Sequence, residues 1–340
     1  MSHDATLFPP PPKPTIAWWR THGFLLGLGV AVLLGFVLPA PGARGGVLHA
    51  GLVTNFGIAL ILFLQGLSLA LEQIRSGAAN WRLHLVIQGF TFVVFPVVGV
   101  VMNWASPWYW PDCPQAIRDG FLYLCVLPST ISSSVVLTAV AGGNTPGALF
   151  NAAFSNILGV MVTPVLVHFL MQKTGQSAPF LPLLMKIMLL TLLPFGLGMA
   201  LRPFLKRWVD EQKVGVARIS NFVILFIVYA AFCDSVVDRV WERHGWGLTV
   251  GACLETTALF TLVSILTWMS CKALRLARPD LIAAYFCSVK KTLAMGVPLA
   301  ILIFGEREDL PLILLPVMLY HPLQLLANGV LASYWAKEAA

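Results

Sequence analysis

The feature that most constrains this chain is a series of long apolar runs that are almost free of charge. A run of about 18 apolar residues matches the ~30 Å of hydrocarbon that a helix must cross. Only 11% of the 340 residues are charged, against about 25% in soluble domains. We therefore predict an all-α integral membrane protein in the lipid bilayer, with ten transmembrane helices near residues 22–38, 48–70, 83–104, 119–141, 146–171, 181–201, 218–236, 248–271, 281–303 and 310–333.

Basic residues in the connecting segments predict the orientation, because cytoplasmic loops carry an excess of Lys and Arg. With the N-terminus inside, the outside segments hold few basic residues: Arg44, Arg118, Lys173, Arg239, Arg243 and Arg307, with Lys186 at a helix end. The inside segments hold about twice as many: Lys13, Arg20, Arg75, Arg82, Arg202, Lys206, Arg207, Lys213, Arg218, Lys272, Arg275, Arg278 and Lys337. We expect a multi-pass protein of the plasma (bacterial inner) membrane with both termini in the cytoplasm.

Three regions are expected along the chain. Residues 1–20 carry the run Pro9–Pro12, which favours an extended, solvated cytoplasmic tail. Residues 21–334 form the transmembrane domain, and residues 335–340 a second cytoplasmic tail. The net charge of +7 lies mostly in the loops, so it indicates membrane orientation and no nucleic-acid partner.

The fourth apolar segment holds a polar pattern that is unusual in a membrane helix. Pro128 removes a backbone hydrogen bond and clashes with the preceding turn. Five of the next six residues carry hydroxyl groups: Ser129, Thr130, Ser132, Ser133 and Ser134. These hydroxyls can satisfy freed backbone groups or coordinate a cation. Two interpretations stay open at this point, a simple kink and an unwound ligand-binding segment.

The ninth segment places Lys290 and Lys291 in the middle of a span, between Ser288 and Thr292. A charge at this depth costs about 2.5–3.5 kcal/mol per residue on insertion scales. Neighbours on a helix are about 100° apart, so both lysines cannot point the same way. Either the segment is unwound or it faces water or acidic partners, or it consists of two short elements with the lysines near an interface. In both cases irregular backbone at this depth implies a cavity lined by protein.

The two unusual segments occupy corresponding positions if the ten spans divide into two halves of five. Many transporters are inverted repeats whose binding site lies at broken helices in such positions. Other polar residues are secondary candidates. Asp234 and Glu255 can pair with a lysine or reach outer water, Gln88 can bond between helices, and Asn151 and Ser155 share a face of the fifth span.

Signatures of an enzyme are missing from the sequence. It contains no HExxH, no P-loop, no GxSxG elbow and no dinucleotide fingerprint. The six cysteines form no CxxC pair, so we expect no disulfide framework, zinc site or other cofactor. Without a P-loop for ATP hydrolysis, transport would be coupled to an ion gradient or would be passive. We also predict that the chain is not an enzyme.

These residues together resemble the bile acid:sodium symporter family. The likeness is strongest to its SBF-like branch, which includes the seventh member of vertebrate solute carrier family 10 and fungal regulators of calcium homeostasis. It covers nearly the whole chain after about residue 20. The motifs that carry it are Gly66–Leu69, Leu83–Leu85 with Gln88, Pro128–Ser134, Gly142–Asn144, Phe150–Asn151 with Phe154, Phe232–Asp234, Phe286–Ser288 with Lys291, and Tyr320–Pro322.

The resemblance implies a fold and a transport cycle. Ten helices would form two inverted repeats, with spans 1, 2, 6 and 7 as a panel domain and spans 3–5 and 8–10 as a core domain. The fourth and ninth helices would break and cross in the core. Substrate would bind between the domains, and two sodium ions would sit beside the crossover.

The family's sodium ligands carry over only in part. A Ser-Asn pair after the first break falls on Ser133 and Ser134, and the fifth-helix ligands fall near Asn151 and Ser155. The third-helix glutamine falls near Gln88. The ninth helix has no Glu or Gln between residues 283 and 298 and carries lysines instead. A lysine ammonium there can take the place of a sodium ion, which leaves coupling to one cation or to protons through a lysine.

We therefore expect a secondary active transporter that carries a small organic anion by alternating access, in symport with Na⁺ or H⁺. The expected crossover and substrate residues are Pro128, Thr130, Ser132, Ser288, Lys290, Lys291 and Thr292. The expected cation or coupling residues are Ser133, Ser134, Asn151, Ser155 and Gln88. No obligate protein partner is expected. The alternative is a non-transporting regulator of membrane or calcium homeostasis.

Overall fold

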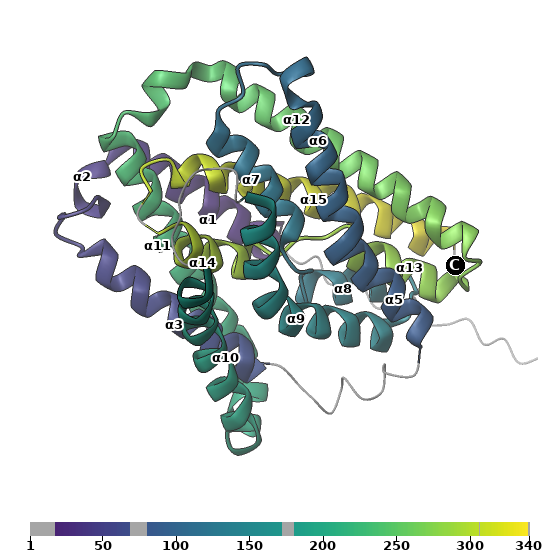
Figure 1. Ribbon diagram of the computed structural model, residues 1–340. Coiled ribbons are helices and arrows are strands. Elements are labelled where there is room, and N and C mark those ends of the chain that lie inside the picture. The colour runs from purple at the N-terminus through teal and green to yellow at the C-terminus, as the bar shows by residue number, and fades with distance from the viewer. Residues whose placement is uncertain (1–17, 69–79, 172–179, 306, 339–340) are drawn as a thin grey trace, which may run out of the picture.

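The computed structural model describes residues 18–68, 80–171, 180–305 and 307–338. Within these ranges the ordered elements are helices and no strand occurs (Figure 1). Each of the ten predicted apolar segments coincides with helical structure. The proline run and the loop residues Lys13, Arg75 and Lys173 lie outside the described residues.

The first five segments form nine elements. The first two segments are α1 (Trp18–Val37), followed by the short α2 (Pro39–Gly42), and α3 (Ala50–Ser68). The third is a continuous rod made of α5 (Trp81–Gly89), the π-helical turn η1 (Phe90–Val94) and α6 (Phe95–Tyr109). The fourth is divided into α7 (Gln115–Val126) and α8 (Ser132–Val140), and the fifth is α9 (Thr145–Met171).

The last five segments form six elements. They are α10 (Phe180–Glu211), α11 (Lys213–Val237), α12 (Val240–Ala273), α13 (Arg278–Ser288), α14 (Leu293–Phe304) and α15 (Leu310–Glu338). A kink in α12 falls at Gly245, whose φ of 66° lies in the left-handed region that glycine adopts without penalty. Helix α1 begins inside the predicted first tail, and α15 runs into the predicted last one.

Among the described residues, eight helices are long and apolar enough to cross a membrane. This supports a multi-pass membrane protein. The two remaining apolar segments are shorter as helices. In α1 the apolar part is the shorter stretch Leu26–Val37. The fourth segment is split into two helices of 12 and 9 residues. At 1.5 Å per residue, neither piece alone covers the ~30 Å of hydrocarbon.

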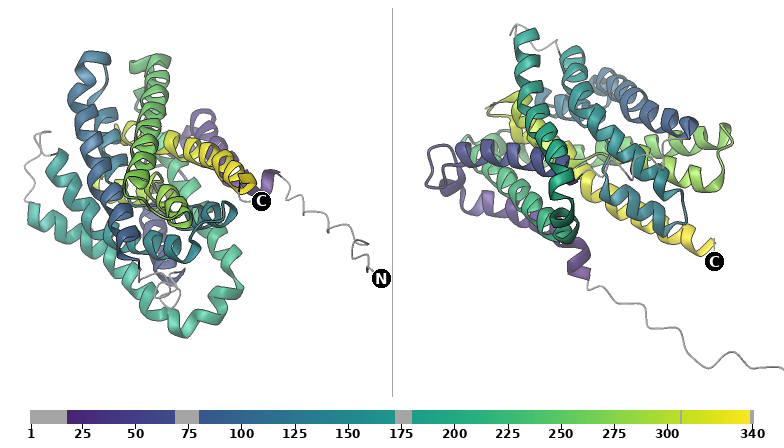
Figure 2. Two further views of the ribbon diagram at one scale, coloured as in Figure 1. Left: turned by 90° about the vertical axis from the view of Figure 1, so that its right-hand side faces the viewer. Right: turned by 90° about the horizontal axis from the view of Figure 1, so that it is seen from below.

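The helices pack in two groups. In the first helix group, α3 lies along α10, and α11 packs against α1, α2 and α3. In the second helix group, α15 packs against α7 and α12, and α13 packs against α5, α8, α9 and α12. The first group lies at the left and lower left of Figure 1, and the right-hand view of Figure 2 shows the same separation. Helix α14 belongs to the second group through its packing on α15, and it also contacts α3, α10 and α11, so it connects the two groups.

Two glycines let α3 and α10 approach closely. A Cβ atom at Gly66 would overlap the backbone of Phe195, and one at Gly198 would overlap the backbone of Phe63. Small residues at such crossings are a common device of membrane helices, because lipid provides no hydrophobic force that drives helices together. Packing of the first helix group therefore depends on these two positions.

Candidate functional site

Two of the long segments are interrupted near their middle, and the interruptions touch each other. The first break covers residues 127–131 and the second covers residues 289–292. The backbone N–H of Thr292 donates to the carbonyl of Pro128 at 3.0 Å, which joins the two breaks directly. The fourth segment is thus unwound over several residues. The ninth is two helices joined by four residues, with both lysines buried within the protein.

Helix α9 satisfies the backbone of the first break. Thr163 Oγ1 donates to the carbonyl of Val126 at 2.8 Å, and Asn156 Nδ2 donates to the carbonyl of Ser129 at 2.8 Å. Ser155 Oγ accepts from the backbone N–H of Ser129 at 3.1 Å. Since unpaired buried backbone groups are costly, these three side chains allow the chain to leave the helical path inside the membrane.

Helix α15 does the same for the second break. Tyr320 donates to the carbonyl of Val289 at 2.7 Å. Gln324 binds Lys291 twice, because its Nε2 donates to the carbonyl and its Oε1 accepts from the backbone N–H, both at 2.8 Å. Each break is therefore held by the long helix that follows its broken segment in the chain, α9 for the first and α15 for the second.

Hydroxyls of the first broken segment also satisfy the end of α13. Ser129 Oγ donates to the carbonyl of Cys287 at 2.6 Å, and Ser134 Oγ donates to the carbonyl of Phe286 at 3.2 Å. The last carbonyls of a helix have no partner within it. The hydroxyl run thus explains how two helix ends can meet in an apolar interior.

Lys291 is the most fully bonded side chain at the breaks. Its Nζ donates to the carbonyls of Thr91 at 3.0 Å, Cys125 at 2.9 Å and Leu127 at 2.7 Å. It also lies 4.0 Å from the ring centroid of Phe95. An ammonium group has three N–H donors, so all three are used.

The three carbonyls are available for identifiable reasons. Cys125 and Leu127 stand at the C-terminus of α7, where carbonyls are unpaired and the helix dipole is negative. Thr91 lies in the π-helical turn, where the N–H of Phe95 bonds to Phe90 instead. The residue five positions after Thr91 is Pro96, which has no N–H to donate. The ammonium occupies a ring of oxygens of the kind that a small cation prefers.

The adjacent lysine has a different environment. The Lys290 side chain is fully buried, and its Nζ has no hydrogen-bond partner among the described residues. Ser288 is likewise buried, with an Oγ that has no partner there. Neither lysine lines the large cavity described below.

The residues expected to hold a cation fall in separate local groups. Thr130 Oγ1 lies 2.7 Å from Ser133 Oγ and 3.1 Å from Ser134 Oγ. Gln88 Nε2 donates to the Asn151 carbonyl at 3.1 Å and to its Oδ1 at 3.3 Å. Asn151 also contacts His84 and the backbone of its own helix.

The two secondary carboxylates have partners of their own. Asp234 accepts from the backbone N–H of Arg44 at 2.7 Å and pairs with the Arg44 guanidinium at 3.4 Å. Glu255 accepts from the Tyr109 hydroxyl at 2.8 Å. Neither carboxylate is among the lining residues of the cavity.

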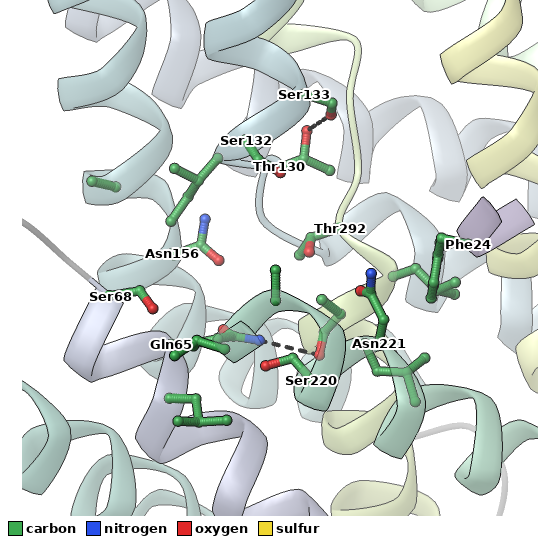
Figure 3. Close-up of a pocket in the computed structure, with 18 of the residues that line it drawn as sticks. Phe24, Gln65, Ser68, Thr130, Ser132, Ser133, Asn156, Ser220, Asn221 and Thr292 are labelled. Atoms are coloured by element: carbon green, nitrogen blue, oxygen red, sulfur yellow. Dashed lines mark hydrogen bonds between the residues drawn. The ribbon is translucent and has the colours of Figure 1, made fainter. Parts of the chain in front are cut away.

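A cavity of about 520 Å³ separates the two helix groups at the level of the breaks (Figure 3). Gln65 of α3 crosses it to donate to the carbonyl of Ala294 at 3.2 Å. The first helix group supplies Phe24, Leu64, Gln65, Ser68, Arg202, Val209, Val216, Ala217, Ser220, Asn221 and Ile224, and the second supplies Thr130–Ser133, Leu149, Ala153, Asn156, Thr292–Ala294, His321 and Leu325.

The electrostatics of this cavity favour negative charge. Helix α8 begins at Ser132 and α14 begins at Leu293, and both residues line the cavity. Each helix N-terminus carries roughly half a positive elementary charge. The described lining residues include Arg202 and no Asp or Glu. The Arg202 guanidinium is itself held by the Leu67 carbonyl at 2.6 Å and by Asp210 at 3.5 Å.

Several residues of this site were not expected from the sequence. The residues predicted to form the site do not include Gln324, Thr163, Asn156 or Gln65. Each of them is a polar residue inside an apolar run, and such a side chain needs a hydrogen-bond partner. The identity of that partner was hidden, because it is the backbone of a distant segment.

Comparison with known proteins shows the family of this chain. The model of the SBF-like CPA transporter family matches residues 22–337. The chain is 37% identical over 320 residues to "Uncharacterized protein PA2026" of Pseudomonas aeruginosa, covering 93% of each chain. It is 31% identical over 322 residues to sodium/bile acid cotransporter 7 of Rattus norvegicus, covering 92% of each chain. This chain therefore belongs to the SBF-like CPA transporter family.

Proposed function

We propose that this protein is a secondary active transporter that carries a small organic anion by alternating access, in symport with Na⁺ or H⁺. The observation that carries the proposal is the cavity between the two helix groups, lined by both breaks. Its volume of about 520 Å³ falls in the range of about 300–1,000 Å³ that is typical of small-molecule sites.

The proposed architecture is ten spans in two inverted repeats of five, with the broken fourth and ninth segments crossing. The first helix group would be the panel of spans 1, 2, 6 and 7, and the second the core of spans 3–5 and 8–10. The equivalent treatment of the breaks supports this proposal, because α9 holds the first and α15 holds the second. Relative motion of the two groups would expose the cavity to alternate sides.

The proposed substrate is an anion because two half-helix N-termini converge on the cavity. A charge near a helix terminus gains roughly 0.3–1 kcal/mol when exposed and up to about 2 kcal/mol when partly buried. Side chains of Ser132, Asn156, Asn221 and Thr292 add polar groups around the same space (Figure 3). Apolar lining residues indicate that the rest of the substrate is organic.

The cavity also suggests which side is open. The lining includes residues near the end of α3, in the last turns of α10 and at the start of α11: Ser68, Arg202, Val209 and Val216. These ends adjoin the basic connection around residues 202–218, and its excess of Lys and Arg predicts that it lies in the cytoplasm. We propose an inward-facing state, with both termini on the cytoplasmic side of the plasma membrane.

For coupling, we propose that the two lysines have different roles. Lys291 serves as a fixed cation in a ring of carbonyls. A mobile Na⁺ would bind at the hydroxyls of Thr130, Ser133 and Ser134, and the other proposed coupling residues are Asn151, Ser155 and Gln88. Alternatively, Lys290 would carry a proton, since its amine has no competing partner among the described residues.

Uptake into proteoliposomes tests this proposal. The probes are a radiolabelled bile acid, chosen from the name of the rat relative, and a set of small mono- and dicarboxylates, each under a Na⁺ gradient and under a pH gradient. Ala217 is exposed and lines the cavity, so Ala217→Trp should stop uptake. Ala200→Trp, at an exposed position of α10 outside the lining, should not. Equal uptake by both variants would place the transport route elsewhere.

The gradients separate the coupling ions, and the wild type tests the alternative function. Uptake driven by Na⁺ and lost in Ser133→Ala indicates sodium coupling. Uptake driven by a pH gradient and lost in Lys290→Met indicates proton coupling. Absence of uptake of every probe by the wild type would contradict the proposal and favour the regulator.

A further inference from the structure

A second cavity, of about 280 Å³, lies at the junction of α12, α13 and α15. It shares no lining residue with the transport cavity. Its lining residues are Trp268, Lys272, Arg275, Leu276, Arg278, Leu281, Ile282, Trp335 and Glu338. The last turn of α12, the first turn of α13 and the last turn of α15 thus enclose it.

The charges of this cavity are unbalanced. Three lining residues are cations and one is an anion. Arg278 pairs with Glu338 at 3.3 Å. Lys272 lies 5.0 Å from the ring centroid of Trp268. Neither Lys272 nor Arg275 has a carboxylate partner in the described part of the chain, so two positive charges remain for a ligand.

The local backbone brings these cations to the same place. Helix α12 ends in a reversal in which the N–H of Leu276 bonds to the carbonyl of Cys271 at 3.1 Å, the pattern of a Schellman cap. Arg275 takes the left-handed position of that cap, with φ of 51°. Helix α13 begins three residues later, at Arg278, so its positive end adds to the same field.

The surroundings of the cavity indicate the depth of lipid headgroups. Trp268 and Trp335 stack with ring centroids 5.6 Å apart, and tryptophan favours the membrane–water interface. Large apolar side chains lead away from the cavity along the outer faces of two helices. On α12 these are Leu262, Ile265 and Met269, and on α15 they are Leu326, Val330 and Tyr334, all exposed.

We propose that this cavity binds the phosphate headgroup of an anionic phospholipid, with the acyl chains along the apolar faces of α12 and α15. Basic pockets between transmembrane helices on the cytoplasmic side are suited to such headgroups. The unpaired Lys272 and Arg275 supply the charge complement, and the adjoining apolar faces distinguish a lipid from free phosphate.

Native mass spectrometry of the purified full-length protein tests the site, with phosphatidylglycerol as the anionic probe and phosphatidylcholine as the neutral one. We expect one retained phosphatidylglycerol. Lys272→Gln with Arg275→Gln should lower its retention more than tenfold. The matched control, Arg207→Gln with Arg218→Gln, removes the same charge from exposed positions in the first helix group and should keep wild-type retention.

A gain-of-binding variant guards against loss by misfolding. Glu338→Gln removes the anion of the cavity and should strengthen retention severalfold while Lys272 and Arg275 stay in place. Inorganic phosphate at 10 mM should not raise the melting temperature. Equal retention of both lipids, unchanged retention in the double variant, or equal stabilisation by inorganic phosphate would each overturn the assignment.

Discussion

Replacing Lys291 with methionine keeps an apolar side chain as far as the Cε position but removes the ammonium group. Three buried carbonyls then lose their donor, those of Thr91, Cys125 and Leu127. A buried acceptor left without a partner costs about 1–3 kcal/mol. The substitution also removes the free-energy cost of burying the Lys291 charge, which offsets part of the loss at the three carbonyls. Because the three partners are neutral carbonyls, no unpaired charge is left behind, and the net loss is that of two or three unpaired acceptors, about 2–5 kcal/mol. We expect Lys291→Met to lower the free energy of unfolding by that amount.

Lys290→Met is the matched control, one residue away and equally buried. Its Nζ has no hydrogen-bond partner among the described residues. A buried polar group without a partner costs free energy, so its removal should leave stability unchanged or raise it by about 1–2 kcal/mol. Equilibrium unfolding in mixed detergent micelles, followed by tryptophan fluorescence, measures both variants. Equal destabilisation would refute the division of roles between the two lysines.

A sodium titration extends the same test. Lys291→Ala leaves the three carbonyls in place and opens the space of the ammonium. If that ring of oxygens suits a small cation, Na⁺ should stabilise this variant and K⁺ or choline should not. The gain follows RT ln(1 + [L]/Kd), about 2.7 kcal/mol at a hundred times Kd. Sodium stabilisation of Lys290→Ala to the same extent would show that the ion binds elsewhere.

Two further substitutions test the packing and the breaks. Gly198→Ala should destabilise the protein by about 1–3 kcal/mol, because its Cβ would overlap the backbone of Phe63; Gly196→Ala, where nothing lies within 4 Å, should be neutral in the same melting assay. Gln324→Leu should cost about 2–4 kcal/mol, because it leaves the backbone N–H and carbonyl of Lys291 unpaired; a melting temperature equal to that of the wild type would contradict this reasoning.

The positions of the helices and the breaks followed from the sequence because both depend on local composition. An apolar run of membrane length predicts a helix whatever its neighbours are. Pro128 with its hydroxyl run, and the two mid-span lysines, stood out because such residues are costly in lipid without a partner. The all-helical membrane fold was confirmed in this way, and the two anomalous segments are the ones that break.

The contacts of the breaks could not be predicted because their partners are backbone groups. Lys291 reaches carbonyls in residues 91, 125 and 127, and every amino acid carries a carbonyl. No side-chain type marks these positions. Only Pro96 leaves a local trace, since it cannot donate to the carbonyl five residues earlier. Similarly, nothing in the sequence around Gln324 shows that its amide bonds to the backbone of Lys291 in the second break.

A tethered cation and a mobile cation differ in what they contribute to transport. Both neutralise the negative C-terminus of α7 and the freed carbonyls beside it, so both support the broken conformation. A mobile ion leaves the protein in each cycle and couples movement to its gradient, whereas the ammonium of Lys291 stays bound to the chain. If Lys291 stands where a relative binds sodium, its ammonium neutralises the same carbonyls as that ion would. It does not couple transport to the sodium gradient. We therefore expect a lower ion-to-substrate ratio than two sodium ions per cycle, measurable as the charge moved per substrate in proteoliposomes.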